Sequence, residues 1–242
     1  MPELFKAYEP QKYEDAIYKQ WERSDLFAPE KSAPADAQEH FSVVLPPPNV
    51  TGTLHMGHAA MLAIEDVMVR YHRMKGDRTL WVPGTDHAAI ATQSKVEKII
   101  AKDLGKTKYD LGRTEFLKHV QAFAQESHDT IVNQCKRMGA SLDWNREAYT
   151  LDTVRSQAVR LVFKQMYDDG LIYQGHRIVN WDPDGQTTVS DDEIVYKEEK
   201  TTFYYFQYGP FVIGTARPET KFGDKYVVVH PGDERYADYN HG

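Results

Sequence analysis

Two histidines separated by two residues, His55 and His58, are the side chains best suited to chemistry in this sequence. They stand in a loop with Gly52 and Gly57, between an apolar run and a helical pattern. The start of a helix collects free backbone N–H groups and the positive end of the helix dipole, so it attracts anions. Glycine lets a ligand come close to the backbone. The pattern therefore predicts a nucleotide-phosphate site in which both rings donate hydrogen bonds.

The same histidine pair could instead bind zinc or belong to the solvated surface. A zinc site needs three or four ligands, and the nearest further candidates are Asp86 and His87, with no cysteine close to the motif. The glycines and the strand-to-helix context favour phosphate over metal. No metal ligands are therefore assigned.

The elements around the histidines predict a parallel α/β fold. The apolar run 41–45 is typical of a buried strand that prolines end, and 79–83 is typical of the next strand. Between them, apolar residues at helical spacing predict a helix that ends at Gly76 and buries one face. The apolar positions are Ala60, Met61, Ile64, Val67, Met68, Tyr71 and Met74. In a right-handed unit both loops open at one sheet edge, so Asp86 is expected near the histidines.

Asp86 has two predicted roles that do not exclude each other. A carboxylate would repel a phosphate, so Asp86 suits the ammonium group of a second substrate. It could also cap the helix that follows, as aspartate often does, and its spacing favours this role.

Two further helices are predicted in the middle of the chain. Apolar spacing predicts one over 114–138, ended by Gly139, and Asp152 can cap the next. Cys135, the only cysteine, lies on the apolar side of the first helix and is interpreted as a core residue. His128 is interpreted as part of a solvated face.

A small β layer is predicted after residue 200. The aromatic run 202–208 and the run 211–213 flank a Gly-Pro turn, which indicates a hairpin, and 226–229 is a third predicted strand.

Composition agrees with a globular protein. The 242 residues are 41% hydrophobic and 27% charged, and no apolar run approaches the length of a membrane span, so no membrane partner is expected. The start of the chain is not typical of a signal peptide. The formal net charge of −7 argues against attraction of RNA over the whole surface, so RNA would need a local basic patch or another part of the protein.

The sequence resembles the N-terminal part of class I aminoacyl-tRNA synthetases, and among them the valyl-tRNA synthetase family. Its signature 55–58 matches the class, while the combination of 46–52 with 83–88 distinguishes the valine family from its leucine and isoleucine relatives. Other matching segments are 7–10, 139–144, 179–183, 215–220 and 230–236.

The resemblance implies ATP-dependent ligation of valine to its tRNA through valyl-adenylate, that is, a valine-tRNA ligase. Its substrates and partners would be valine, ATP with Mg²⁺, and valine tRNA. The implied catalytic residues are His55 and His58. The implied ATP-binding residues are Gly52, Thr53, His55, Gly57 and His58. The implied amino-acid-binding residues are Pro46, Pro47, Asn49 and Asp86.

The resemblance also implies hydrolytic editing of threonyl-tRNA by an inserted β-rich domain. Thr215, Arg217 and Thr220 match a motif of its pocket. Residues 182–186 replace the paired cysteines that hold zinc in some members, so no structural zinc is expected.

The implied domain organisation has three parts. Residues 1–40 would be an N-terminal helical extension, 41–185 the first half of a Rossmann-like catalytic domain, and 186–242 the beginning of the editing insertion. Complete members are several times longer, so this chain alone is expected to be inactive. The whole enzyme is expected to be a cytoplasmic monomer.

Two other classes of protein stay open. A synthetase-like paralogue or nucleotide-binding module could keep the fold without catalysis. A different α/β nucleotidyltransferase could share the loop at 55–58, but this would not explain 83–93 or 215–220.

Overall fold

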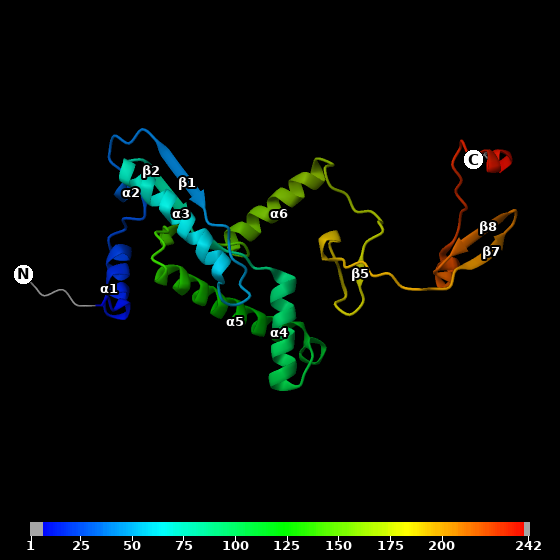
Figure 1. Cartoon of the computed structure of the whole chain (residues 1–242), viewed down its shortest axis with the longest axis horizontal. Coiled ribbons are helices and arrows are strands. Elements are labelled where there is room, and N and C mark those ends of the chain that lie inside the picture. Colours follow the sequence, from blue (N-terminus) through cyan, green and yellow to red (C-terminus); the bar gives the residue numbers. More distant parts are fainter. Residues whose placement is uncertain (1–6, 240–242) are drawn as a thin grey trace, which may run out of the picture. The chain divides into compact units, whose positions relative to one another are not determined.

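The computed structural model describes residues 7–239. These residues belong to two compact units, one ending at Tyr173 and the other starting at Gln174. Figure 1 shows the elements of both units in chain order. Each unit is described by itself.

Two short parallel sheets of two strands each form the centre of the first unit. Strand β1 (His40–Val44) pairs in parallel with β2 (Arg78–Val82). Beyond Pro83, β3 (Gly84–Thr85) pairs in parallel with β4 (Ala148–Tyr149). The two predicted strands and their parallel relation are confirmed. Strand β4 has no local sequence signal, because two residues are too short for a periodic pattern.

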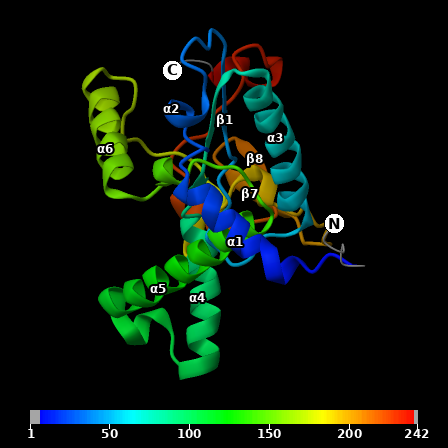
Figure 2. The same cartoon turned by 90° about the vertical axis from the view of Figure 1, so that its left-hand side faces the viewer.

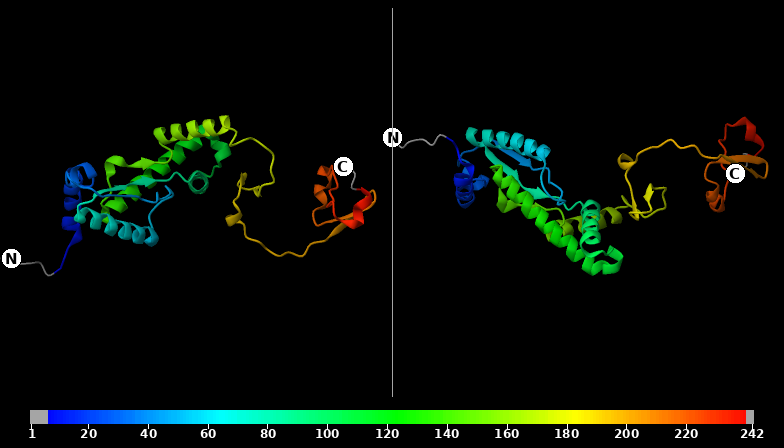
Figure 3. Two further views of the ribbon diagram at one scale, coloured as in Figure 1. Left: turned by 90° about the horizontal axis from the view of Figure 1, so that it is seen from above. Right: turned by 60° about the horizontal axis from the view of Figure 1, so that its bottom comes forward.

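Helix α3 (Met56–Lys75) connects β1 to β2 and packs against both strands, as the right-hand view of Figure 3 shows. It ends at Gly76, whose φ of 94° lies in the left-handed region. The predicted helix and its glycine stop are confirmed.

The buried face of α3 differs from the predicted one. Leu62 and Val69 are buried, and Glu65, between them, accepts a hydrogen bond from the Trp81 indole Nε1 at 3.0 Å. Most of the predicted stripe is exposed, with Met74 at 89%. The exposed residues are Ala60, Ile64, Val67, Met68, Tyr71 and Met74. The prediction was wrong because apolar residues occur on two sides of this helix. The side that faces the sheet contains Leu62 and Val69 and also the polar residue Glu65, so its apolar pattern is weaker.

The core of this unit lies between α3, the sheet and helix α5 (Lys108–Arg137). Its buried members are Leu45, Leu62, Val69, Trp81, Ile131, Cys135, Ala140 and Leu142. The predicted core position of Cys135 is confirmed. Helix α5 begins at Lys108, with a break at Gly112, and so extends the helix predicted over 114–138 at its start.

The remaining helices surround this core. Helix α4 (Ala89–Leu104) packs against α5 through Val96, Ile100 and Phe116, and Figure 2 shows the two helices together. Helix α6 (Thr153–Asp168) starts at Asp152, whose carboxylate accepts from the Arg155 N–H at 2.8 Å, so the predicted cap is confirmed. The other helical elements of the unit are α1 (Pro10–Arg23), α2 (Pro29–Ser32) and η1 (Trp144–Arg146).

His128 is only partly solvated and has two carboxylate partners. Its Nε2 lies 2.5 Å from Glu147 Oε1 and its Nδ1 lies 3.0 Å from Asp129 Oδ1, and the side chain is 23% exposed. The interpretation was wrong because Glu147 is brought to α5 from beyond the helix.

The second unit consists of hairpins and short turns. Strands β7 (Tyr204–Tyr208) and β8 (Phe211–Thr215) form the predicted antiparallel hairpin. The predicted strand 226–229 is wrong: the segment has no strand partner, and Tyr226 and Val228 are about nine-tenths exposed, at 87% and 90%. Strand propensity does not hold a strand without a neighbour to accept its hydrogen bonds.

The other elements of this unit are short. They are β5 (Trp181–Asp182), β6 (Thr187–Thr188), η2 (Asp191–Glu193), η3 (Pro218–Gly223) and η4 (Glu234–Tyr239). Asp182 closes the β5–β6 turn by accepting from the backbone N–H groups of Asp184 and Gly185, each at 3.1 Å. Within residues 7–239, no helix is long and apolar enough to cross a membrane.

Candidate active site

Both histidines of the motif cap the start of α3. His55 is the residue before the helix, and its Nδ1 accepts a hydrogen bond from the Gly57 N–H at 3.1 Å. His58 Nδ1 accepts from the backbone N–H of His55 at 3.2 Å. The ring centroids are 3.9 Å apart. The first turn of the helix thus holds the two rings against each other.

This arrangement fixes the proton on each neutral ring. A neutral imidazole has one donor nitrogen and one acceptor nitrogen, so a ring that accepts at Nδ1 carries its proton on Nε2. Burial, together with the neighbouring His55, lowers the pKa of His58 and favours its neutral form. Among the described residues, neither Nε2 has a hydrogen-bonding partner. Both N–H groups are therefore free to donate to a ligand.

The loop before the histidines is attached to the neighbouring parts of the unit. Gly52 has a φ of +137°, which a residue with a Cβ rarely adopts. Lys95 Nζ, on α4, donates to the Thr51 carbonyl at 2.6 Å, and the Leu54 N–H donates to Gln134 Oε1 at 2.8 Å. Neither Lys95 nor Gln134 was predicted from the sequence, since both lie far along the chain from the loop.

Asp86 lies beside the start of this loop. The Val50 N–H donates to the Asp86 carbonyl and the Asp86 N–H donates to the Pro48 carbonyl, both at 2.8 Å, so Asn49 and Asp86 form a parallel bridge. The loops after β1 and β2 therefore meet at one sheet edge, as predicted. The histidines follow Asn49 along the same loop.

Asp86 does not cap α4. The residue at the cap position is Ala88, with a φ of 40° and no side-chain hydrogen bond to the helix. The Asp86 carboxylate instead accepts from the Thr150 hydroxyl at 2.9 Å, beyond β4. The capping prediction was wrong because α4 begins two residues too late for Asp86 to reach its first N–H groups. Its carboxylate is 38% exposed and can meet a ligand.

The predicted amino-acid residues lie around the same edge. A Cβ placed on Gly84 would lie 3.0 Å from the Ala148 carbonyl oxygen and 4.0 Å from the Pro47 Cβ, so Pro47 packs beside β3. Pro46, Pro47 and Asn49 are exposed, as is Thr53, two residues before His55. The structure thus places Asn49 beside Asp86 and Pro47 beside β3.

Comparison with known proteins identifies the family. Residues 16–229 match the family described as tRNA synthetases class I (I, L, M and V). The chain belongs to the class I tRNA synthetases. The family resemblance seen in the sequence is confirmed.

The relatives that are similar to this chain include several valine–tRNA ligases. The Treponema denticola protein is 47% identical over 97% of this chain and 27% of its own length. The Thermotoga maritima protein is 46% identical over 99% of this chain and 28% of its own length. The Chlamydia muridarum protein is 45% identical over 96% of this chain and 25% of its own length. The synthetase chain therefore spans about a quarter of the length of these relatives.

A solved structure agrees at the level of the fold. The LeuRS chain of a ternary complex with tRNA and LeuAMS from Agrobacterium radiobacter K84 superposes with a TM-score of 0.62 at 21% identity. The match covers 78% of this synthetase chain and 22% of that chain. It supports a mixed α/β class I fold with parallel strands.

The three predicted editing residues of this synthetase chain lie at the end of β8 and in the turn that follows it. The Arg217 N–H donates to Thr215 Oγ1 at 3.0 Å, and the Thr220 hydroxyl donates to the Arg217 carbonyl at 2.8 Å. The Arg217 side chain pairs with Glu219. The structure thus brings Thr215, Arg217 and Thr220 together.

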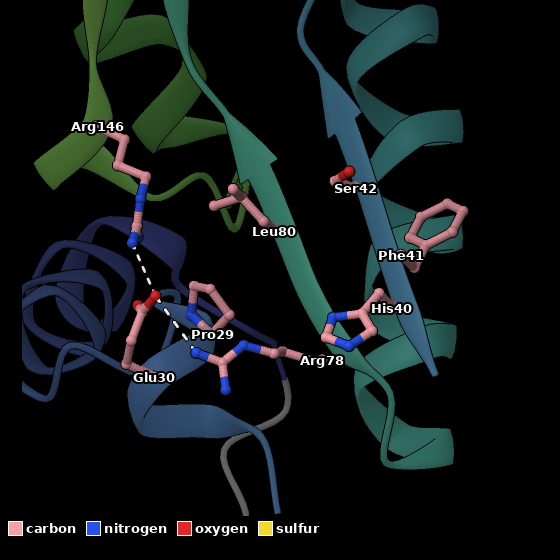
Figure 4. A pocket seen from close by; sticks show the side chains of 8 residues that line it. All are labelled: Pro29, Glu30, His40, Phe41, Ser42, Arg78, Leu80 and Arg146. Carbon is pink, nitrogen blue, oxygen red and sulfur yellow. Dashed lines mark hydrogen bonds and ion pairs between the residues drawn. The ribbon is translucent and has the colours of Figure 1, made fainter. Parts of the chain in front are cut away.

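A cavity of about 240 Å³ lies at the opposite end of the sheet from the histidine loop of the synthetase (Figure 4). Glu30 forms its charged wall, with Oε1 at 2.9 Å from Arg146 Nη2 and 3.6 Å from Arg78 Nη2. The other lining residues are Pro29, His40, Phe41, Ser42 and Leu80. Ligands of parallel α/β sheets bind at the carboxyl ends of the strands, and this cavity lies beside their amino ends. It is therefore not the candidate active site.

No group of three or more metal-ligating side chains occurs within residues 7–239.

Proposed function

We propose that this chain is the part of a valine–tRNA ligase that binds ATP and valine and forms valyl-adenylate. The observation that carries the proposal is the meeting of two loops at one sheet edge: one presents the Nε2 groups of His55 and His58, and the other presents the carboxylate of Asp86. The similarity to valine–tRNA ligases supports this substrate among those of the family.

The histidines act on the phosphates of ATP. Their Nε2–H groups donate to phosphate oxygens, and the helix start adds its dipole to the same end of the site. Gly52 and Gly57 leave room for the phosphates, and Thr53 lies beside them. Because both rings are already held by α3, they need no rearrangement when charge develops on the transferring phosphate.

Asp86 binds the ammonium group of valine. A carboxylate that is half-buried beside Thr150 makes a charge-assisted hydrogen bond to an ammonium and repels the phosphates toward the histidines. Pro46, Pro47 and Asn49 shape the apolar part of the pocket around the side chain of valine.

The reaction joins the two substrates in line. A carboxylate oxygen of valine bonds to the α-phosphorus of ATP, the bond from that phosphorus to the bridging oxygen breaks, and pyrophosphate leaves. A terminal ribose hydroxyl of valine tRNA then attacks the valyl carbonyl, and AMP leaves. Mg²⁺ bound to the ATP phosphates would neutralise part of their charge, as it commonly does in such sites. The protein's contribution is positioning and charge stabilisation.

Residues 186–242 are the beginning of an editing insertion, after an N-terminal helical extension over 1–40 and the first half of a Rossmann-like domain over 41–185. An apolar pocket cannot strongly reject threonine, which is nearly isosteric with valine, and the valine enzymes are the established example of this difficulty. Thr215, Arg217 and Thr220 would line a hydrolytic pocket for threonyl-tRNA. No structural zinc is expected, because residues 182–186 replace the paired cysteines that hold zinc in some members of the family.

The complete enzyme is proposed to be a cytoplasmic monomer. Residues 1–242 by themselves are expected not to charge tRNA, because they span only about a quarter of the length of the valine–tRNA ligases that they resemble.

The test is valine-dependent exchange of pyrophosphate into ATP by the full-length protein, with leucine, isoleucine and threonine as competing substrates. We expect exchange with valine, weaker exchange with threonine and little with the larger amino acids. A protein that binds ATP but exchanges with none of them would be a synthetase-like paralogue. Preference for leucine or isoleucine would contradict the assigned substrate.

A further inference from the structure

The hydroxyl of Thr150 occupies the junction between Asp86 and His87. Thr150 Oγ1 lies 2.9 Å from Asp86 Oδ1. It also lies 3.0 Å from the backbone nitrogen of His87 and 2.6 Å from His87 Nδ1. One side chain thus contacts both residues that follow β3.

The hydrogen bonds of this hydroxyl have only one consistent assignment. A threonine hydroxyl has one donor and two acceptor positions. The backbone N–H of His87 must donate to it, so one acceptor position is filled. An ionised carboxylate can only accept, so the hydroxyl donates to Asp86. His87 Nδ1 then carries a proton and donates to the second acceptor position. All three positions are used.

This assignment gives the two oxygen atoms of the Asp86 carboxylate different surroundings. Oδ1 accepts from Thr150, with His87 Nδ1 also 3.4 Å away. Within the described part of the chain, Oδ2 has no hydrogen-bond partner. The Asp86 side chain is 38% exposed, and Oδ1 is already bonded to Thr150. Oδ2 is therefore the oxygen that remains to accept a hydrogen bond from a substrate ammonium.

The backbone holds Thr150 firmly at this place. Its N–H donates to the Thr85 carbonyl at 3.2 Å and extends the parallel pairing of β3 with β4. Just before β4, Glu147 contacts His128 of α5. Just after it, Asp152 caps α6. Thr150 is therefore anchored by the sheet and by two helices, and not by a free loop.

We propose that Thr150 is a positioning residue that orients the carboxylate of Asp86 toward the ammonium group of the amino-acid substrate. This inference rests on the proposed function of Asp86. It extends that function by naming the group that holds Oδ1, so that Oδ2 alone faces the substrate.

The kinetic test uses two variants of the full-length protein in valine-dependent exchange. Thr150→Val keeps the shape and removes the hydroxyl, whereas Thr150→Ser keeps the hydroxyl. We expect Thr150→Val to raise the KM for valine about tenfold with the KM for ATP unchanged, and Thr150→Ser to stay near the wild type. Equal loss in both variants, or an equal rise in both KM values, would overturn the proposal.

A double-mutant cycle separates positioning from a general structural role. If Thr150 acts through Asp86, then Thr150→Val should add little to the KM for valine in an Asp86→Asn background. A full additional effect in that background would show that Thr150 acts elsewhere.

A crystal structure of the Thr150→Val variant tests the orientation of the Asp86 carboxylate directly, without an activity measurement. We expect the Asp86 carboxylate to leave its present orientation. An unchanged carboxylate would overturn the inference by itself. Failure of the proposed function has a different signature, because the wild-type protein would then show no exchange with valine.

Discussion

His58 Nδ1 accepts the backbone N–H of His55 at 3.2 Å, and the two rings stand 3.9 Å apart at the start of α3. One edge of each ring therefore completes the helix, and the opposite edge carries the N–H that can meet a ligand. The two roles can be separated, because different nitrogen atoms perform them.

Asparagine substitutions should separate capping from catalysis. His55→Asn keeps an acceptor that is favoured at the helix cap but loses the distal N–H. Its thermal stability should stay close to that of the wild type, while valine-dependent exchange falls about 10²-fold or more. His55→Ala and His58→Ala should lose comparable activity, and His55→Ala should also lose about 1 kcal/mol of stability. Wild-type exchange by His55→Asn would show that the ring is only a cap.

Asp86→Asn should weaken valine binding without unfolding the protein. The amide keeps an oxygen that accepts from Thr150, but it no longer carries the charge that an ammonium requires. We expect the KM for valine to rise about tenfold or more, with the KM for ATP unchanged. Asp152→Asn is the matched control, since it makes the same chemical change at the cap of α6 and should leave both values unaltered. Equal effects at the two positions would contradict the assigned role of Asp86.

Gly57→Ala should lower activity while preserving the helix. A Cβ at this position would lie 2.9 Å from His55 Cε1 and 3.1 Å from its Nδ1, so the ring must move. Alanine is the better helix former by about 1 kcal/mol, and this gain offsets a cap loss of similar size when the His55 ring moves away from the helix start. We expect reduced exchange at a nearly unchanged melting temperature. Gly223→Ala, where a Cβ would meet nothing within 4 Å, tests whether any added methyl group has this effect.

The thiol of Cys135 should be inert in the folded protein. Burial raises its pKa to about 11, and the residue is 1% exposed, so almost no accessible thiolate exists at pH 8. Ellman's reagent should therefore label no cysteine in the native chain and one after unfolding in guanidinium. Rapid labelling of the native chain would mean that the core around α5 opens readily.

The His128 cluster should make stability depend on pH. Burial disfavours the charged ring, but the contacts with Asp129 and Glu147 outweigh it and raise the pKa of His128 above 6.5. A raised pKa in the folded state means that the stabilisation is complete below pH 6.5 and is lost as the pH rises through the folded value. In urea unfolding, the stability advantage of the wild type over His128→Gln should therefore shrink from pH 6 to pH 9.

Removal of the carboxylate checks the cause of this dependence. Glu147→Gln keeps a side-chain oxygen near the His128 ring but removes the negative charge. It should therefore reduce the pH-dependent part of the free energy of unfolding. An undiminished pH dependence in Glu147→Gln would exclude the His128–Glu147 contact as its source.

Much of the framework around the site could be predicted from local sequence. The strands on either side of α3, its glycine stop and the hairpin after residue 203 depend on patterns within a few residues of each other. The cap at Asp152 also acts only on the next turn of the chain. Such features follow from backbone geometry and nearby side chains, so their prediction did not require a knowledge of the fold.

Only the tertiary structure decided which face of a helix is buried and which partner each polar side chain has. Both sides of α3 are apolar, and the sheet selects the side with Leu62 and Val69. Asp86 has a cap-like spacing, yet it pairs with Thr150, 64 residues away. His128 similarly meets Glu147, and the apolar run 226–229 finds no strand to join. Each outcome depends on whether a group from elsewhere in the chain lies beside the segment, and periodicity within one segment contains no information about this.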